Sequence, residues 1–101
     1  NKMGEYSLTN KAITDLSEIW DYSCAQFSEN QADLYYLDLI SYCEILAENP
    51  TIGKKYDELD LGILGFVAKK HLIFYKILYP NEILIIRILS GNVDLKNRFR
   101  E

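Results

Sequence analysis

The sequence has few of the residues that interrupt a folded chain, with five glycines and two prolines among 101 residues. Hydrophobic residues make up 49% of it and charged residues 26%. A chain of this composition can offset its conformational entropy by burying apolar side chains, which disordered segments cannot do. Intrinsic disorder is therefore excluded for most of the chain, and its length predicts a single domain over residues 1–101.

Long hydrophobic runs are also missing. Residues 72–78 and 83–88 are the longest apolar runs, and each contains a charged side chain. Both fall far short of the roughly 20 residues that cross a bilayer, so we expect no membrane partner. No basic and then apolar start marks the chain for secretion, and with Met3 as the natural start the expected location is the cytoplasm.

Cysteine and histidine are scarce, being limited to Cys24, Cys43 and His71. The cysteines fall on successive predicted helices that fold back on each other near Glu29. Cys24 should then lie across from about position 34, which is nine positions before Cys43. At 1.5 Å per helical residue this separates the two cysteines by roughly 13 Å, beyond the ~7 Å limit between the Cα atoms of a disulfide. We expect two free thiols acting as small buried hydrophobes. With no CxxC motif and one imidazole, we expect no metal site and no cofactor.

Basic charge is in short supply in the first half of the chain. Residues 1–50 carry two lysines against nine acids, whereas residues 51–101 carry nine basic residues against six acids, within a net charge of −4. The halves are therefore −7 and +3. This acid excess argues against non-specific nucleic acid binding. We also expect no direct sequence-specific nucleic acid binding by the chain alone. A surface for an anionic partner has to lie in the second half.

Apolar side chains recur at helical spacing through the first half. Residues 5–8 alternate between polar and apolar and predict a short strand, after which Thr9 or Asn10 can cap a helix. The first apolar stripe predicts an amphipathic helix of about five turns. Its members are Ile13, Leu16, Ile19, Trp20, Cys24 and Phe27.

A second amphipathic helix follows. Ser28 and Gln31 form a capping-box pattern, and the apolar stripe stops before Asn49-Pro50. The stripe consists of Ala32, Tyr35, Tyr36, Leu39, Cys43 and Leu46. Two adjacent amphipathic helices predict a helical hairpin. We expect its aromatic residues to pack between the helices and on the sheet, part of them staying exposed until a partner covers them; these are Trp20, Phe27, Tyr35, Tyr36 and Tyr42.

The second half is predicted to form strands. A polar segment over residues 53–57 is interpreted as a surface loop, and residues 64–68, 71–78 and 83–89 predict three consecutive antiparallel strands. Both faces of the last two strands are apolar. One face should pack on the helical hairpin, and the other must be covered too. Residues 92–101 predict a short helix or ordered tail that the core does not require. The fold class is therefore α+β.

This order of elements coincides with local motifs that cover essentially the whole chain. They are Tyr6-Ser7-Leu8, Ala12, Asp15-Leu16, Ile19-Trp20, Gln31-Ala32, Tyr35-Tyr36, Leu46-Ala47-Glu48-Asn49-Pro50, Ile52-Gly53-Lys54, His71-Leu72-Ile73-Phe74-Tyr75 and Arg87-Ile88-Leu89. In these motifs the sequence resembles the ParE branch of the RelE/ParE toxin superfamily of bacterial toxin–antitoxin systems. The resemblance implies a RelE/ParE-like fold and a single toxin domain. It also implies a non-enzymatic toxin that poisons DNA gyrase, blocks replication and is neutralised by a cognate ParD-like antitoxin.

Two alternatives to gyrase poisoning stay open. Some superfamily members are ribosome-dependent mRNA endonucleases of the RelE type, which need a Tyr or His near the C-terminus to activate a ribose 2′-OH. After Arg87 this chain carries neither, so we expect no catalytic residue. The other alternative is a weakly toxic homologue that only binds its antitoxin. It is favoured by Ser90, Val93 and Leu64, where family members commonly carry His, Met and Arg respectively.

Four residues are the candidates for contact with the target. Arg87 lies in an apolar strand, where an unpaired guanidinium would cost several kcal/mol. Two interpretations are open: it presents its donor fork to the target, or it anchors the C-terminal segment through Asp94. Arg98, Phe99 and Arg100 are the preferred contacts because they form a basic tail, the alternative being a frayed terminus.

The remaining candidates have structural or partner roles, and they are His71, Tyr75, Ser90, Asp94, Trp20 and Tyr36. His71 begins a strand, and a hydrogen bond to the backbone is expected for it in preference to catalysis. We also expect a groove along the apolar helices and sheet that takes an amphipathic helix or strand of the antitoxin. The acidic first half favours basic residues on that partner.

Overall fold

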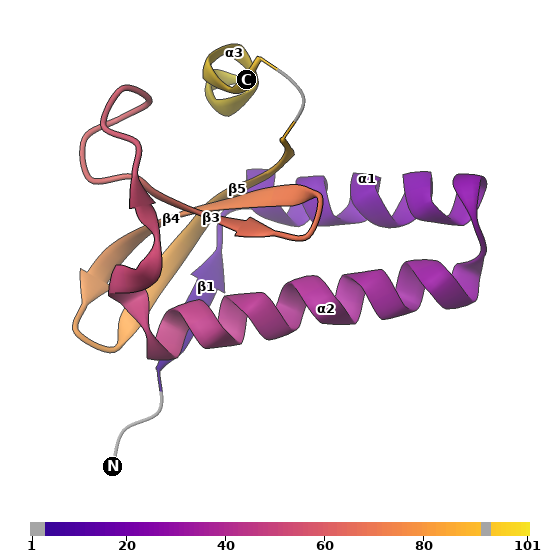
Figure 1. The fold of residues 1–101 in the computed structure, drawn as a ribbon, viewed down its shortest axis with the longest axis horizontal. Coiled ribbons are helices and arrows are strands. Elements are labelled where there is room, and N and C mark those ends of the chain that lie inside the picture. Colours follow the sequence, from indigo (N-terminus) through magenta and orange to yellow (C-terminus); the bar gives the residue numbers. More distant parts are fainter. Residues whose placement is uncertain (1–3, 92–93) are drawn as a thin grey trace.

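The computed structural model describes residues 4–91 and 94–101, so Met3 and Val93 lie outside the described residues. Figure 1 shows the order of the elements, in which a strand and two helices precede a run of strands and a last short helix. The elements are β1 (Glu5–Leu8), α1 (Asn10–Gln26), α2 (Glu29–Glu48), the 3₁₀ turn η1 (Pro50–Ile52), β2 (Lys54–Lys55), β3 (Leu64–Ala68), β4 (His71–Tyr79), β5 (Glu82–Ser90) and α3 (Leu95–Arg100). The predicted α+β order is confirmed.

The strands form one five-stranded sheet in the order β1-β5-β4-β3-β2. The predicted meander of β3, β4 and β5 is antiparallel, as expected. β1 joins it at the outer edge of β5 and runs parallel to that strand, with Glu5 opposite Glu82 and Leu8 opposite Ile85. β2 pairs with β3 at the other edge. The prediction of a surface loop over residues 53–57 was therefore wrong at β2, because two residues are too few to show an alternating pattern.

Side chains close the start of both long helices. The Thr9 hydroxyl accepts from the backbone N–H of Ala12 at 3.0 Å, and the Ser28 hydroxyl accepts from that of Gln31 at 3.1 Å. Each bond satisfies one of the N–H groups that a helix leaves free at its first turn. The predicted hairpin is confirmed, with Thr9 in preference to Asn10 as the first cap. Neither helix, nor any other in the described part of the chain, has the length and apolarity to cross a membrane.

The main core lies between the hairpin and one face of the sheet. Its fully buried members are Ala12, Leu16, Leu39, Cys43, Leu46, Ala47, Ala68, Ile73, Tyr75, Ile83, Ile85 and Ile88. Cys43 is the small buried hydrophobe that was expected, and burial raises the pKa of its thiol to about 12. Cys24 is also a free thiol, but it is only half-buried.

The far end of the hairpin extends beyond the sheet (Figure 1). Phe27 ends α1 at this far end and is consequently 66% exposed, while Ile13, in the first turn of α1, is also exposed at 51%. The expectation that part of the aromatic set is left exposed is confirmed at Phe27. A helix that overhangs its sheet has no surface on which to bury this part of its stripe.

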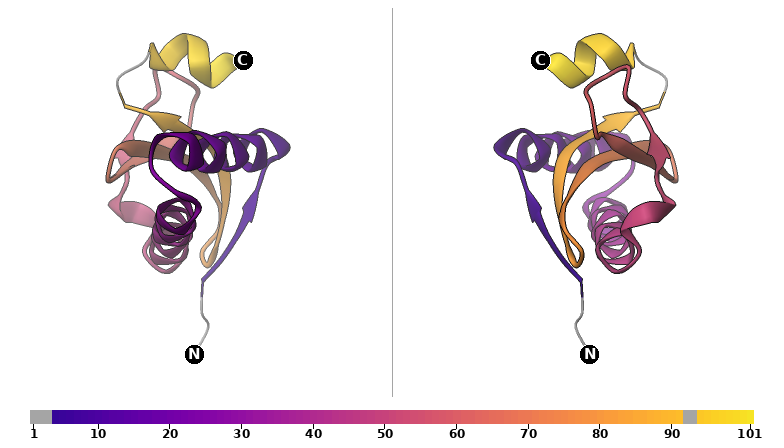
Figure 2. Two further views of the ribbon diagram at one scale, coloured as in Figure 1. Left: turned by 90° about the vertical axis from the view of Figure 1, so that its right-hand side faces the viewer. Right: turned by 90° about the vertical axis from the view of Figure 1, so that its left-hand side faces the viewer.

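The opposite face of the sheet has a second apolar cluster. Figures 1 and 2 place the 56–63 loop and α3 on the side of the strands opposite α2. The buried members of the cluster are Leu59, Ile63, Leu72, Phe74 and Leu89, and the half-buried ones are Tyr56, Ile86, Leu95 and Phe99. The expectation that this face is covered is confirmed. The expectation that the core does not require the C-terminal segment was wrong, because α3 supplies part of the cover.

Candidate functional site

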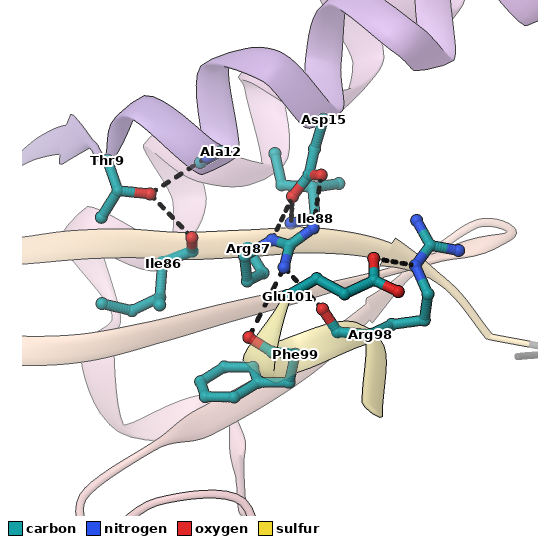
Figure 3. A network of polar contacts seen from close by, with 9 residues as sticks. All are labelled: Thr9, Ala12, Asp15, Ile86, Arg87, Ile88, Arg98, Phe99 and Glu101. Atoms are coloured by element: carbon teal, nitrogen blue, oxygen red, sulfur yellow. Dashed lines mark hydrogen bonds and ion pairs between the residues drawn. The ribbon is translucent and has the colours of Figure 1, made fainter. Parts of the chain in front are cut away.

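Arg87 is buried in an ion pair with Asp15 of α1 (Figure 3). Its Nε donates to one carboxylate oxygen of Asp15 at 2.8 Å and its Nη2 donates to the other at 2.8 Å. Both residues are 5% exposed. Hydrogen bonding to Asp15 raises the pKa of Arg87, which therefore stays charged. This bidentate geometry holds the guanidinium plane in one orientation.

Asp15 also completes the hydrogen bonds of the sheet edge. β1 ends at Leu8, so the outer edge of β5 has no strand neighbour beyond Ile85. The Thr9 hydroxyl instead donates to the carbonyl of Ile86 at 2.7 Å, and the backbone N–H of Ile88 donates to Asp15 at 2.9 Å (Figure 3). Buried backbone groups need such partners, and here two side chains take the place of a strand.

The third nitrogen of Arg87 holds the C-terminal helix. Nη1 donates to the backbone carbonyl of Arg98 at 2.6 Å and to that of Phe99 at 3.5 Å. A cation is favoured at these carbonyls because a helix carries partial negative charge at its C-terminus. Of the two interpretations of Arg87, these contacts correspond to an anchor for the C-terminal segment.

The partner predicted for Arg87 was wrong, since it is Asp15 and not Asp94. Asp94 caps α3 instead, accepting from the backbone N–H of Asn97 at 3.5 Å and from its side-chain amide at 2.7 Å. Sequence reasoning missed Asp15 as the partner. The available signal was its position between Ala12 and Leu16, because an acid on the buried face of an amphipathic helix needs a cationic or N–H partner.

The structure separates the three tail candidates. Phe99 turns its ring onto Phe74, with the ring centroids 5.6 Å apart in an edge-to-face arrangement. Arg98 is half-buried and its Nε donates to Glu101 at 3.1 Å. Arg100 is exposed. Of these three candidates, Arg100 and, in part, Arg98 are therefore open to a partner.

We expected His71 to form a hydrogen bond with the backbone, but its partner is a side chain. Its Nδ1 lies 2.7 Å from the hydroxyl of Tyr35, which also accepts from the backbone N–H of Lys70 at 3.4 Å. Burial lowers the pKa of His71, and the more distant Asp15 acts in the opposite direction. Neutral His71 can then accept a hydrogen bond at Nδ1 from the Tyr35 hydroxyl. Ser90 lies opposite His71 across β4 and β5.

Tyr75 is a buried anchor for η1. Its hydroxyl donates to the carbonyl of Pro50 at 2.7 Å and accepts from the backbone N–H of Gly53 at 3.0 Å. Burial raises the pKa of Tyr75, so the hydroxyl keeps its proton. Any β-carbon at position 53 would collide with this hydroxyl. These contacts give Tyr75 a structural role.

Trp20 and Tyr36 line an open groove of about 400 Å³ between β1, α1 and α2. The other lining residues are Leu8, Ile13, Leu16, Ser17 and Asp33. The indole N–H of Trp20 donates to Asp33 at 2.9 Å, which fixes the Trp20 ring in the groove wall. The helices around it are acidic, since no lysine or arginine occurs between Lys11 and Lys54. We refer to these seven residues as the hairpin groove.

Within residues 4–91 and 94–101, no group of three or more His, Cys, Asp or Glu side chains is arranged to hold a metal ion.

Comparison with known proteins gives consistent matches along nearly the whole chain. The family model described as "ParE toxin of type II toxin-antitoxin system, parDE" matches residues 6–95. The chain is similar to two curated relatives, both called Toxin ParE1. The relative from Mycobacterium tuberculosis (strain ATCC 25618 / H37Rv) is 31% identical over 90 residues, which is 89% of this chain and 92% of the relative. The relative from Caulobacter vibrioides is 31% identical over 94 residues, 93% of this chain and 96% of the relative.

A solved structure described as a chromosomal ParDE TA system from P. aeruginosa has a similar fold. The superposition gives a TM-score of 0.72 at 20% sequence identity and covers 87% of this chain and 95% of that chain. At this identity the likeness concerns the fold alone.

Proposed function

The chain belongs to the ParE toxin family of type II toxin–antitoxin systems, and on that premise we propose that it poisons DNA gyrase in the cytoplasm. In this proposal the toxin stabilises the complex between gyrase and cleaved DNA and so blocks replication. It acts by binding and performs no chemistry of its own. A cognate ParD-like antitoxin neutralises it.

The gyrase proposal rests on one observation: the buried Arg87 is already paired, and no proton-transferring His or Tyr follows it in the sequence. A ribonuclease has to bring free cations and a proton-transferring side chain to a phosphate. Here the buried Arg87 is committed to Asp15 and to α3, and the chain after it carries no His or Tyr. This arrangement supports a toxin that acts by contact over one that cuts RNA.

The hairpin groove supports the antitoxin part of the proposal. Its apolar wall includes Ile13 and Trp20, and the helices that form it carry acidic charge apart from Lys11. An amphipathic antitoxin helix with apolar anchors and basic flanks would match the groove in both respects. Binding there would also cover the exposed part of the first apolar stripe.

The proposed contact with gyrase lies on the basic second half, at Arg98 and Arg100 of α3. The hairpin repels polyanions, because Lys11 is its only basic residue and the rest of its charge is acidic. A toxin that approaches gyrase and its bound DNA would therefore turn α3 toward the complex and the hairpin away from it.

The test is a gyrase supercoiling and DNA-cleavage assay with purified toxin that is free of antitoxin. We expect gyrase-dependent cleaved DNA from the unchanged protein and much less from the variant Arg98→Ala/Arg100→Ala. The control variant Lys54→Ala/Lys55→Ala removes the same charge from β2, the edge strand farthest from β1, and should leave cleavage unchanged. Cleavage of ribosome-bound mRNA without an effect on gyrase would support the nuclease instead. Antitoxin binding with neither activity would identify a weakly toxic homologue.

A further inference from the structure

We infer that Asp15 is a positioning residue of the toxin: through Arg87 it sets the docked position of α3, and thereby the presentation of Arg98 and Arg100. The part that concerns toxicity rests on the proposed function. The part that concerns the position of α3 rests on the contacts alone.

α3 cannot hold its place by itself. It has six residues, and an isolated helix of this length is not stable in water. The Asp94 cap stabilises its first turn without attaching it to the rest of the molecule. Two anchors join it to the sheet: the apolar packing of Leu95 and Phe99 on the second cluster, with the Phe99 ring on Phe74, and the bonds from Arg87 to the carbonyls of Arg98 and Phe99.

The two anchors differ in what they specify. An edge-to-face aromatic contact tolerates sliding and rotation, whereas a hydrogen bond of 2.6 Å to one carbonyl specifies the register of the helix. The bond from Arg87 therefore determines which residues of α3 face outward. Arg98 and Arg100 keep their exposure only in that register.

Asp15 determines where Arg87 points. It binds Nε and Nη2 and so leaves Nη1 directed at α3, as Figure 3 shows. Asp15 is itself fixed by α1 and by the backbone N–H of Ile88. A rigid chain of contacts thus runs from α1 across the edge of β5 to α3.

Neutralising Asp15 would leave a buried guanidinium without its counter-charge. Such a group is strongly unfavourable, and Arg87 would turn toward water to recover solvation. Its Nη1 would then leave the carbonyls of α3. The hydrogen bond to Ile88 can persist in Asp15→Asn, because the asparagine side chain keeps one carbonyl oxygen.

The experiment uses the full chain with Asp15→Asn, and Asp21→Asn as a control that removes the same charge from the exposed face of α1. Hydrogen exchange at residues 95–101 should speed up by roughly tenfold in Asp15→Asn, as expected for one lost charge-assisted hydrogen bond. The slowest amides of β4 should change less, and growth arrest should be lost. Asp21→Asn should match the unchanged protein in all three measurements.

A second variant covers the case in which Asp15→Asn does not fold. Asp15→Asn/Arg87→Met removes both buried charges, and such replacements are often neutral for stability. It should fold, exchange rapidly at α3 and cause no arrest, a combination that a merely stabilising ion pair does not predict.

Unchanged exchange at α3 in either folded variant would overturn the inference, and so would arrest that persists after α3 is released. Failure of the proposed function has a separate signature. If the unchanged toxin arrests growth without affecting gyrase, and release of α3 still abolishes arrest, the target is wrong and the role of Asp15 stands.

Discussion

At the scale of single residues, several polar side chains in the described structure each form hydrogen bonds with two or three partners. Asp15 accepts three hydrogen bonds, and the hydroxyls of Tyr35 and Tyr75 each join two partners. Within residues 4–91 and 94–101 no buried side-chain nitrogen or oxygen lacks a partner. Each of these bonds joins elements far apart in the sequence, so a change at one residue is transmitted between elements.

The Tyr35–His71 pair leads to a prediction about pH. Burial holds the pKa of His71 below its ordinary value of 6.5 in the folded protein. The unfolded chain therefore binds more protons in mild acid, and the contribution of His71 to stability is complete above pH 6.5. That contribution is lost as the pH falls through the lower, folded value.

We expect the free energy of unfolding, measured by urea denaturation, to fall as the pH is lowered below 6.5. The same titration of His71→Gln should be flatter between that pH and the onset of carboxylate protonation. Equal slopes in the two proteins would show that His71 does not couple to stability.

At the scale of elements, α3 has two functions that use opposite sides of the helix. Leu95 and Phe99 cover the second apolar cluster, while Arg100 faces solvent. The same six residues are therefore part of the core and part of the proposed contact surface. A toxin assay on a truncated chain cannot separate the two functions, whereas single substitutions can.

Phe99→Ala tests the covering function. Phe99 is half-buried, so removing its ring should lower the free energy of unfolding by about 1–2 kcal/mol, less than for a fully buried phenylalanine. Urea denaturation with Arg100→Ala as the control, which should change stability by under about 0.5 kcal/mol, measures it. An equal effect of the two substitutions would contradict a cover over the second cluster.

At the scale of the whole molecule, charge and exposed apolar surface divide the toxin into two faces. The hairpin side is acidic apart from Lys11 and has the hairpin groove, while nine of the eleven basic residues are on the sheet strands, their turns and α3. A partner bound in the groove and a partner bound at α3 would contact different elements. Neutralisation by an antitoxin in the groove would then need to cover α3 as well, or to block access to the proposed target sterically.

Ile13→Asp tests the groove. The substitution adds a charge to an exposed apolar wall residue, so it should leave the fold intact while weakening antitoxin binding by roughly 100-fold, about 3 kcal/mol. Titration calorimetry or rescue of growth by co-expressed antitoxin measures the loss. Ile52→Asp is the matched control, since Ile52 is similarly exposed (48%, against 51% for Ile13) but lies in η1. Equal weakening by both substitutions would place the antitoxin elsewhere.

Much of the fold could be predicted from local patterns. The hairpin followed from two apolar stripes and the Ser28 cap, and the meander followed from strands with two apolar faces. The family followed from short motifs in the right order. The sequence could not show that Phe27 is the exposed aromatic residue, because periodicity shows which side of a helix is apolar and not where its partner sheet ends.

The sequence by itself determined that Arg87 needs a partner and that the second face of the sheet needs a cover, because burial of an unpaired charge or exposure of an apolar face is costly whatever the topology. Only the tertiary structure decided that the partner is Asp15 and that α3 is part of the cover. Positions 15 and 87 are 72 residues apart. They meet because β1 pairs with β5 in parallel and brings the start of α1 to the open edge of that strand.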